Sequence, residues 1–172
     1  LFQVLIENGD EVIIPAPYWV TYPEQVKFSD GVPVFIETDD STDFKITAEQ
    51  LKAAITPKTK ILLLNTPSNP TGSVYSKEEL LAIGEVLKGT DIIVLSDEMY
   101  EKIIYNDKKF TAAAEVSSDM FKRTVTINGL SKAVAMTGWR FGYIATPDAS
   151  LAKAMTKLQG QVTSNINTMT QY

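Results

Sequence analysis

Short apolar runs recur along this chain, and most are separated by enough residues for one helix. Three of the runs, Glu11–Ile14, Lys60–Leu64 and Asp91–Leu95, begin on a charged residue and are apolar from there. Strands that are covered on both faces have this composition, whereas half-exposed strands alternate between apolar and polar residues. We therefore expect strands at these runs and at three further β-rich segments, Val32–Glu37, Thr124–Ile127 and Gly142–Thr146.

Helix signals lie between the expected strands. Two segments have the form of a capping box, in which a Ser or Thr side chain caps the first turn and a Glu or Gln three residues later caps it in return. They begin at Thr47 and Ser76, and they predict helices that run through Ile55 and Leu87.

Two more helices are expected outside the capping boxes. Asp148 can cap a long helix, and Tyr18–Phe28 is typical of a helix that has Pro23 near its first turn. The alternation of strands and helices predicts an α/β fold with a mainly parallel, doubly wound sheet, which is a three-layer α/β/α sandwich. A chain of 172 residues is long enough for one such domain with a sizeable core.

The composition excludes several classes of function. The chain has no cysteine and no histidine, which rules out disulfides, thiolate zinc sites and histidine-based catalytic triads. Its net charge of −5 argues against a nucleic-acid surface. The apolar runs are too short to span a membrane, and the lack of cysteine fits a cytoplasmic protein. Chemistry must therefore come from Lys, Asp, Glu, Tyr, Arg or a cofactor.

Polar and aromatic residues follow four of the expected strands. The carboxyl ends of parallel strands share one edge of a sheet, and ligands of doubly wound folds gather at that edge. The segments that follow the strands are Pro15–Trp19, Asn65–Gly72, Ser96–Tyr100 and Asn128–Lys132. They bring Trp, Asn, Asp, Tyr and Lys side chains to one rim, which is the predicted ligand site.

Lys132 is the most informative residue of this rim. It follows the run Thr124–Ile127 in a turn of small residues, where we expect a lysine to be poorly solvated. Such an amine can act as a base or form a Schiff base with an aldehyde. Gly129 and Ser131 leave space for a ligand, and the alternative bases are missing. The other interpretation is an ordinary lysine whose stem packs on the turn.

Asp97 lies at the end of a buried strand and has two interpretations. Its carboxylate could cap the next helix, or it could pair with a cation such as a protonated pyridine nitrogen. Tyr100, three residues further on, can reach the same site, although a single tyrosine is more often part of the core or the rim.

The remaining candidate residues are Asn69, Trp19 and Arg140. Asn65–Gly72 contains two prolines and a glycine, so it is a rigid turn in which Pro70 restricts the backbone of Asn69. Trp19 either joins the core or offers a flat plate on which a ring can stack. Arg140 has a planar donor fork that suits a phosphate, and otherwise it would make an ordinary ion pair.

Four segments of the chain, in this order, resemble the class I and II aminotransferases, the fold-type I pyridoxal-phosphate enzymes of the aspartate aminotransferase kind. Together they extend over nearly the whole chain. The segments are Pro17–Trp19, Asn65–Gly72, Ser96–Tyr100 and Ser131–Gly142.

The resemblance implies a role for each candidate residue. Lys132 is then the Schiff-base lysine and the base that moves a proton between the amino-acid Cα and the cofactor. Asp97 holds the pyridine nitrogen protonated, so that the ring remains an electron sink. The remaining cofactor contacts fall to Tyr100 and Asn69 at the ring 3′ oxygen, Trp19 on the ring face and Arg140 at the phosphate.

The resemblance also implies what this chain lacks. Many members carry a phosphate-binding serine three residues before the lysine, and here that position is Gly129. The phosphate cradle is expected before Leu1, and the arginine that binds the substrate carboxylate is expected beyond Tyr172. Residues 1–172 are then the central part of the cofactor-binding large domain, with Gly142–Thr146 running antiparallel beside an exposed sheet edge. This piece is expected to be inactive alone and its parent to be a homodimer.

The activity implied for the parent is transfer of an amino group between an amino acid and a 2-oxo acid. One alternative is another chemistry on the same cofactor, such as a C–S β-lyase, a decarboxylase or a cyclopropane-forming synthase. Another is an aminotransferase-like effector domain of a transcription regulator. The sequence of Met136–Arg140 resembles the bacterial branch of the family that acts on aspartate and aromatic amino acids. The sequence does not indicate which amino acid is preferred.

Overall fold

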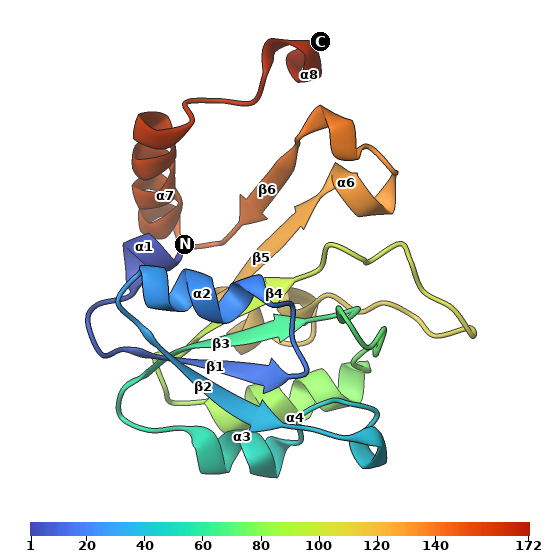
Figure 1. Cartoon of the computed structure of the whole chain (residues 1–172). Helices are drawn as coiled ribbons and strands as arrows, with labels where there is room; N and C mark the ends of the chain where they lie inside the picture. The colour runs from blue at the N-terminus through green and yellow to red at the C-terminus, as the bar shows by residue number, and fades with distance from the viewer.

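The computed structural model describes all 172 residues and contains one sheet of six strands (Figure 1). Every neighbouring pair of strands is parallel except the last, which is antiparallel. The predicted α/β class and the antiparallel last strand are confirmed. The sheet order is β2 (Val32–Glu37), β1 (Glu11–Ala16), β3 (Thr59–Asn65), β4 (Ile93–Asp97), β5 (Thr124–Gly129) and β6 (Gly142–Ala145).

Eight α-helices and three short 3₁₀ helices precede, connect or follow the strands. No helix is both long enough and apolar enough to cross a membrane. The α-helices are α1 (Phe2–Leu5), α2 (Thr21–Phe28), α3 (Ala48–Ala54), α4 (Lys77–Leu87), α5 (Ser118–Arg123), α6 (Leu130–Ala133), α7 (Ala149–Val162) and α8 (Thr168–Gln171). The 3₁₀ helices are η1 (Asp40–Thr42), η2 (Ala113–Glu115) and η3 (Thr137–Trp139).

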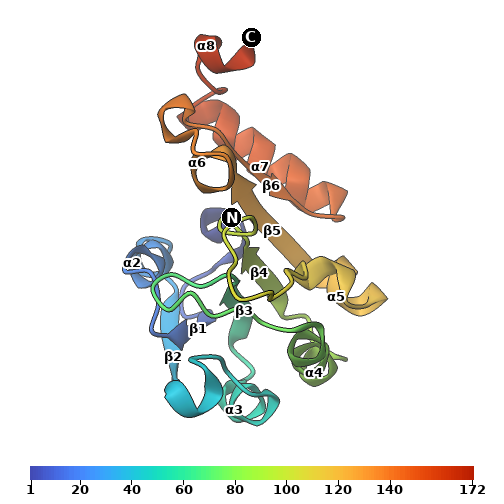
Figure 2. The ribbon, with the colours of Figure 1, turned by 90° about the vertical axis from the view of Figure 1, so that its right-hand side faces the viewer.

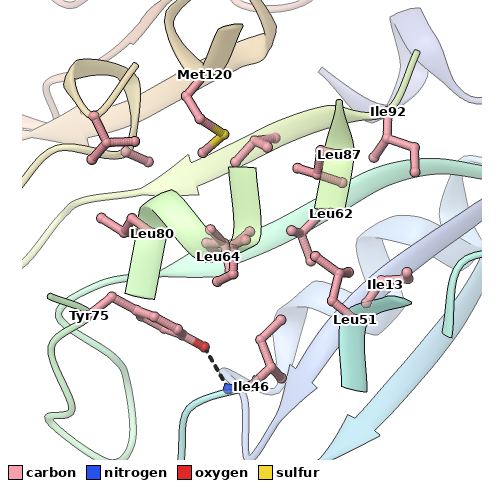
Figure 3. Close-up of a cluster of buried hydrophobic side chains, with 14 of the residues drawn as sticks. Ile13, Ile46, Leu51, Leu62, Leu64, Tyr75, Leu80, Leu87, Ile92 and Met120 are labelled. Atoms are coloured by element: carbon pink, nitrogen blue, oxygen red, sulfur yellow. Dashed lines mark hydrogen bonds between the residues drawn. The ribbon is translucent and has the colours of Figure 1, made fainter. Parts of the chain in front are cut away.

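The central strands of the sheet are buried on both faces. Successive side chains of a strand point to opposite sides, so each of these strands contributes to two cores. On β3, Leu62 and Leu64 enter a core with α3, α4 and α5, of which Figure 3 shows a part. Ile61 and Leu63 enter a second core with α1, α2 and α7. All four side chains are at most 1% exposed. Figure 2 shows the sheet running between α2 on one side and α4 and α5 on the other.

The predicted caps are confirmed, and one helix begins later than predicted. Thr47 and Ser76 each cap the backbone N–H three residues on at 3.2 Å, and the reciprocal hydrogen bond of each box is present. Asp148 caps α7. However, α2 begins at Thr21 instead of Tyr18. Proline is tolerated in a first turn, where N–H groups have no partner in the helix, and this start keeps Pro23 there.

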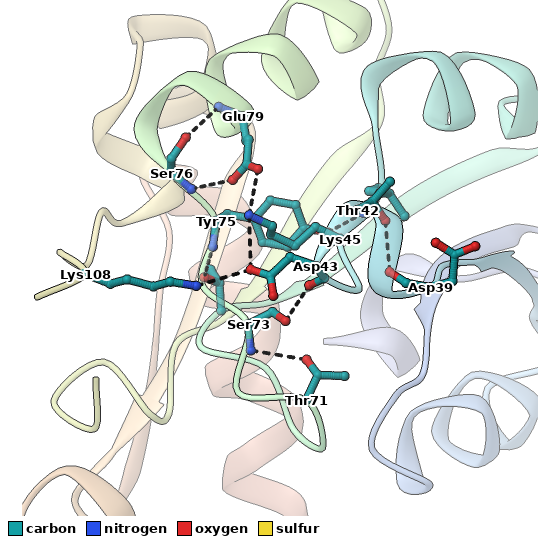
Figure 4. A network of polar contacts seen from close by, with 12 residues as sticks. Asp39, Thr42, Asp43, Lys45, Thr71, Ser73, Tyr75, Ser76, Glu79 and Lys108 are labelled. Carbon is teal, nitrogen blue, oxygen red and sulfur yellow. Dashed lines mark hydrogen bonds and ion pairs between the residues drawn. The ribbon is translucent and has the colours of Figure 1, made fainter. Parts of the chain in front are cut away.

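A network of charged side chains ties two loops that are distant in sequence to the first turn of α4 (Figure 4). Lys45 pairs with Glu79 at 2.7 Å and with Asp43 at 3.6 Å, and Lys108 pairs with Asp43 at 3.2 Å. Partly exposed pairs of this kind each contribute about 1 kcal/mol or less. Their consequence is positional, because Lys108 anchors the long loop after β4, which also carries Tyr100.

The last strand, β6, forms one edge of the sheet. All four residues of Gly142–Ala145 are exposed, and Tyr143 and Ile144 are large apolar side chains. An edge of this kind can pair with another chain. The predicted exposed edge beside the antiparallel strand is therefore confirmed.

The two-sided core leads to a prediction about stability. Leu62→Ala removes a fully buried side chain from the centre of the sheet, so we expect it to lower the free energy of unfolding by about 3 kcal/mol. Val162→Ala, at a side chain that is 67% exposed, should change it by less than about 0.5 kcal/mol. Urea denaturation measures both changes. Equal losses in the free energy of unfolding would contradict the burial of the central strands on both faces.

Candidate functional site

The carboxyl ends of three adjacent strands lie at one level. In the register of the sheet, Asn65 of β3 pairs with Asp97 of β4, and Asp97 pairs with Ile127 of β5. The segments that follow these strands therefore start at one edge of the sheet, as the sequence predicted. This edge is the candidate site.

Asp97 is held by two hydrogen bonds. The Tyr22 hydroxyl donates to Oδ2 at 2.6 Å, and the Met99 backbone N–H donates to Oδ1 at 3.1 Å. A turn follows β4 instead of a helix, so the alternative in which Asp97 caps a helix is wrong. The carboxylate is half-buried, and its orientation is fixed while lone pairs remain for a further donor.

The turn after β3 is organised by Asn65. The Asn65 side-chain amide donates to the Asp97 carbonyl oxygen at 3.0 Å and to the Pro67 carbonyl oxygen at 3.2 Å. Its side-chain oxygen accepts from the Asn69 backbone N–H at 2.7 Å. The interpretation of this segment as a rigid turn agrees with these bonds. Because Asn69 is held through its backbone, its half-buried side chain is left for a ligand.

Lys132 lies in α6, which starts directly after β5. Its Nζ is 5.7 Å from the centroid of the Tyr100 ring, which is within the range of a cation–π contact. None of the ion pairs of the chain includes Lys132. The expectation that this lysine is poorly solvated is wrong for the chain as it stands. Lys132 is exposed because α6 projects past the end of the sheet (Figure 1).

Trp19 lies on the surface, with 41% of its area exposed. Its ring meets the Tyr22 ring edge to face, at a centroid distance of 5.4 Å and an interplanar angle of 87°. The alternative in which Trp19 is a core residue is therefore wrong. Through Tyr22, the indole is linked to the Asp97 carboxylate.

Arg140 is exposed, and none of the ion pairs of the chain includes it. Its guanidinium donates to the Thr137 carbonyl oxygen at 2.9 Å, within its own turn. The backbone of Arg140 is in the left-handed region, with φ of 54°. Its alternative role in an ion pair is not found, because no carboxylate pairs with it.

Comparison with known proteins decides the family. The model of the family described as aminotransferase class I and II matches residues 1–172. The chain belongs to this family. It is 54% identical to an aspartate aminotransferase of Geobacillus stearothermophilus and 51% identical to an asparagine–oxo-acid transaminase of Streptococcus mutans, each over the whole chain but only 44% of the relative.

Solved aminotransferase structures have the same fold. The aspartate aminotransferase from Rhizobium meliloti superposes with a TM-score of 0.95 at 45% identity, over 99% of this chain and 42% of that chain. An aromatic aminotransferase from Pyrococcus horikoshii superposes with a TM-score of 0.94 at 38% identity, over 99% of this chain and 45% of that one. The chain thus spans less than half of the length of the relatives that it matches.

Two residues of this aminotransferase-family rim were not singled out from the sequence. Asn65 organises the turn, and Tyr22 donates to Asp97. For Asn65 there was a signal, because it is the first residue after an apolar strand. For Tyr22 there was none, because a helix residue 75 positions before Asp97 carries no local sign of that contact.

Glu98 is a buried carboxyl group beside the site, with 3% of its area exposed. Its Oε1 accepts from the Ser96 hydroxyl at 2.8 Å and from the Ala113 backbone N–H at 3.1 Å. Burial raises the pKa of the Glu98 carboxyl above its usual value. The two hydrogen bonds lower this pKa, and the nearby charges of Glu101 and Glu115 raise it. Glu98 closes the loop that carries Tyr100.

Glu98 predicts a dependence of stability on pH. A carboxyl group with a raised folded-state pKa supports the folded state below its unfolded pKa, and that support is lost as the pH rises through the folded pKa. We therefore expect Glu98→Gln to gain stability relative to the wild type as the pH rises from about 4 to about 8. Urea denaturation across this range measures the difference. Glu49→Gln, at an exposed position of α3, controls for the lost charge, and an equal trend in both variants would contradict the prediction.

Gly129 has no space for a side chain where β5 meets β6. A Cβ at Gly129 would lie 2.8 Å from the Phe141 carbonyl oxygen and 3.1 Å from the Gly142 Cα, both of which are backbone atoms. A serine at this position, where the resemblance places one in many family members, would therefore require the backbone of β6 to shift.

The close approach at Gly129 can be tested. Gly129→Ala should lower the free energy of unfolding by about 2 kcal/mol, because the backbone of β6 has to move. Gly138→Ala is the matched control, since a Cβ there meets no atom within 4 Å. Thermal denaturation compares the two variants, and a neutral Gly129→Ala would show that the strands are not packed this closely.

Proposed function

We propose that the whole protein containing this chain transfers an amino group between an amino acid and a 2-oxo acid, using pyridoxal 5′-phosphate. One observation carries the proposal. An oriented carboxylate, Asp97, ends β4, and a lysine without an ion pair, Lys132, follows the neighbouring β5 at the same edge of an aminotransferase-family sheet. Relatives named as aspartate aminotransferases support amino transfer over the other chemistries of this cofactor. They equally disfavour a transcription-regulator domain, and aspartate is the amino donor to test first.

The chemistry of the rim fits the cofactor. A protonated pyridine nitrogen needs an anion, and Asp97 has lone pairs left after its two hydrogen bonds. Asn69 and Tyr100 would donate to the ring 3′ oxygen, and Trp19 presents an exposed ring face for stacking. When it is bound, the cofactor supplies an electron sink for negative charge at the substrate Cα.

Arg140 would bind the cofactor phosphate. Its guanidinium uses one donor on the Thr137 carbonyl oxygen, so four of its five donors are left for phosphate oxygens. Arg140 is exposed, so its guanidinium is accessible to a phosphate.

Lys132 would be the base of the reaction. Its Nζ would move a proton between the amino-acid Cα and the cofactor. None of the ion pairs of the chain includes Nζ, which lies 5.7 Å from the centroid of the Tyr100 ring. The reaction thus relies on Lys132 for proton movement and on Asp97 for charge balance at the opposite end of the ring.

We further assign residues 1–172 to the central part of the cofactor-binding large domain. The support is that the chain spans 44% of its aspartate aminotransferase relative from Geobacillus stearothermophilus, so the phosphate cradle and the small domain belong to other segments. The assignment also includes a homodimeric parent and a cytoplasmic location, and it makes this piece inactive by itself.

Lys132 provides the direct test of this proposal. The whole protein is mixed with pyridoxal phosphate, reduced with borohydride and digested, and the labelled peptide is located by mass spectrometry. We expect one adduct on Lys132 that is lost in Lys132→Ala, together with a fall in kcat of at least about 100-fold for aspartate and a 2-oxo acid. Lys153→Ala, an exposed lysine of α7, should keep both the adduct and the activity. Labelling spread over several lysines would contradict the proposal.

A further inference from the structure

Tyr22 makes the closest side-chain contact of Asp97. Its hydroxyl donates to Asp97 Oδ2 at 2.6 Å, from the first turn of α2 to the end of β4. Tyr22 itself is 5% exposed, and it borders a hollow of about 530 Å³ that is mostly apolar. A hydrogen bond in such surroundings is stronger than the same bond in water.

Tyr22 is a donor that does not ionise under working conditions. Burial raises the pKa of the Tyr22 hydroxyl far above its ordinary value, and the negative charge of Asp97 and the hydrogen bond to it raise it further. The hydroxyl therefore keeps its proton, and that proton points at Asp97. A donated hydrogen bond favours the ionised form of a carboxylate.

Tyr22 also supports the indole that would cover the cofactor ring. Trp19 packs edge to face on the Tyr22 ring at a centroid distance of 5.4 Å. One side chain thus touches both the partner proposed for the pyridine nitrogen and the plate proposed for the ring face. The Asp97 carboxylate accepts one side-chain hydrogen bond, from Tyr22, and its other hydrogen bond comes from the Met99 backbone N–H.

We infer that Tyr22 is a positioning residue of the aminotransferase site, which holds Asp97 ionised and aimed at the pyridine nitrogen of the cofactor. This inference rests on the proposed function. Without the Tyr22 hydroxyl, the proton shared between the pyridine nitrogen and Asp97 is held less by the nitrogen, because the carboxylate loses a donor that stabilised its charge. The Tyr22 hydroxyl acts through Asp97, whereas the Tyr22 ring supports Trp19. Removal of the hydroxyl alone should therefore change the ring nitrogen first.

The test uses the whole protein loaded with pyridoxal phosphate that carries ¹⁵N in its ring. In the wild type we expect the ¹⁵N chemical shift of a protonated pyridine. In Tyr22→Phe, which keeps the ring packed against Trp19, the shift should move towards neutral pyridine, and the dissociation constant of the cofactor should rise about tenfold. Loss of buried packing alone does not move the nitrogen shift.

Tyr75→Phe is the matched control. Tyr75 is 3% exposed, and its hydroxyl accepts a hydrogen bond from the Ile46 backbone N–H at 2.9 Å, so this variant also loses a buried hydroxyl. Thermal denaturation of both variants shows that each is folded. The control should keep the wild-type ¹⁵N shift.

The outcomes separate the two ideas. A wild-type protein that does not bind the cofactor overturns the proposed function and this inference with it. A loaded wild type whose ¹⁵N shift is unchanged in Tyr22→Phe overturns the inference alone. Equal shifts in both tyrosine variants also overturn it, because the effect would then come from general loosening of the fold.

Discussion

Burial of the central strands on both faces is the constraint on which the rest of the structure depends. The side chains of Ile61–Leu64 enter two separate cores in alternation, so a slip of β3 by one residue would exchange the two sets. That burial sets the register of β3 against its neighbours. The register in turn places Asn65 beside Asp97 and Asp97 beside Ile127. The site is therefore positioned by the packing of leucines and isoleucines that take no part in its chemistry.

The candidate site combines fixed groups with free ones. Asp97 is oriented by Tyr22, and the turn after β3 is organised by Asn65, so both are determined within this chain. Lys132 and Arg140 are exposed, and no carboxylate pairs with either of them. The chain spans less than half of the length of the relatives that it matches. The contacts within the chain therefore orient Asp97 and the turn after β3 but leave Lys132 and Arg140 without a charged partner.

Local signals in the sequence predicted the elements well, and their limits have physical causes. Capping boxes at Thr47 and Ser76 are formed by residues three apart, so their partners are visible in the sequence. The solvation of Lys132 was predicted wrongly, because solvation depends on what packs over a turn and not on the strand before it. The start of α2 was placed three residues too early, because a proline near the first turn limits where a helix can begin without fixing its first residue.

The sequence by itself determined the α/β class, the order of the strands along the chain and the family, since apolar runs, caps and four motif segments are all local patterns. Only the tertiary structure decided that Tyr22 meets Asp97, that Trp19 lies on the surface and that Gly129 has no room for a side chain. The physical reason is the same in each case. These contacts join separate elements, and their geometry follows from the packing of helices on a twisted sheet, which no single segment encodes.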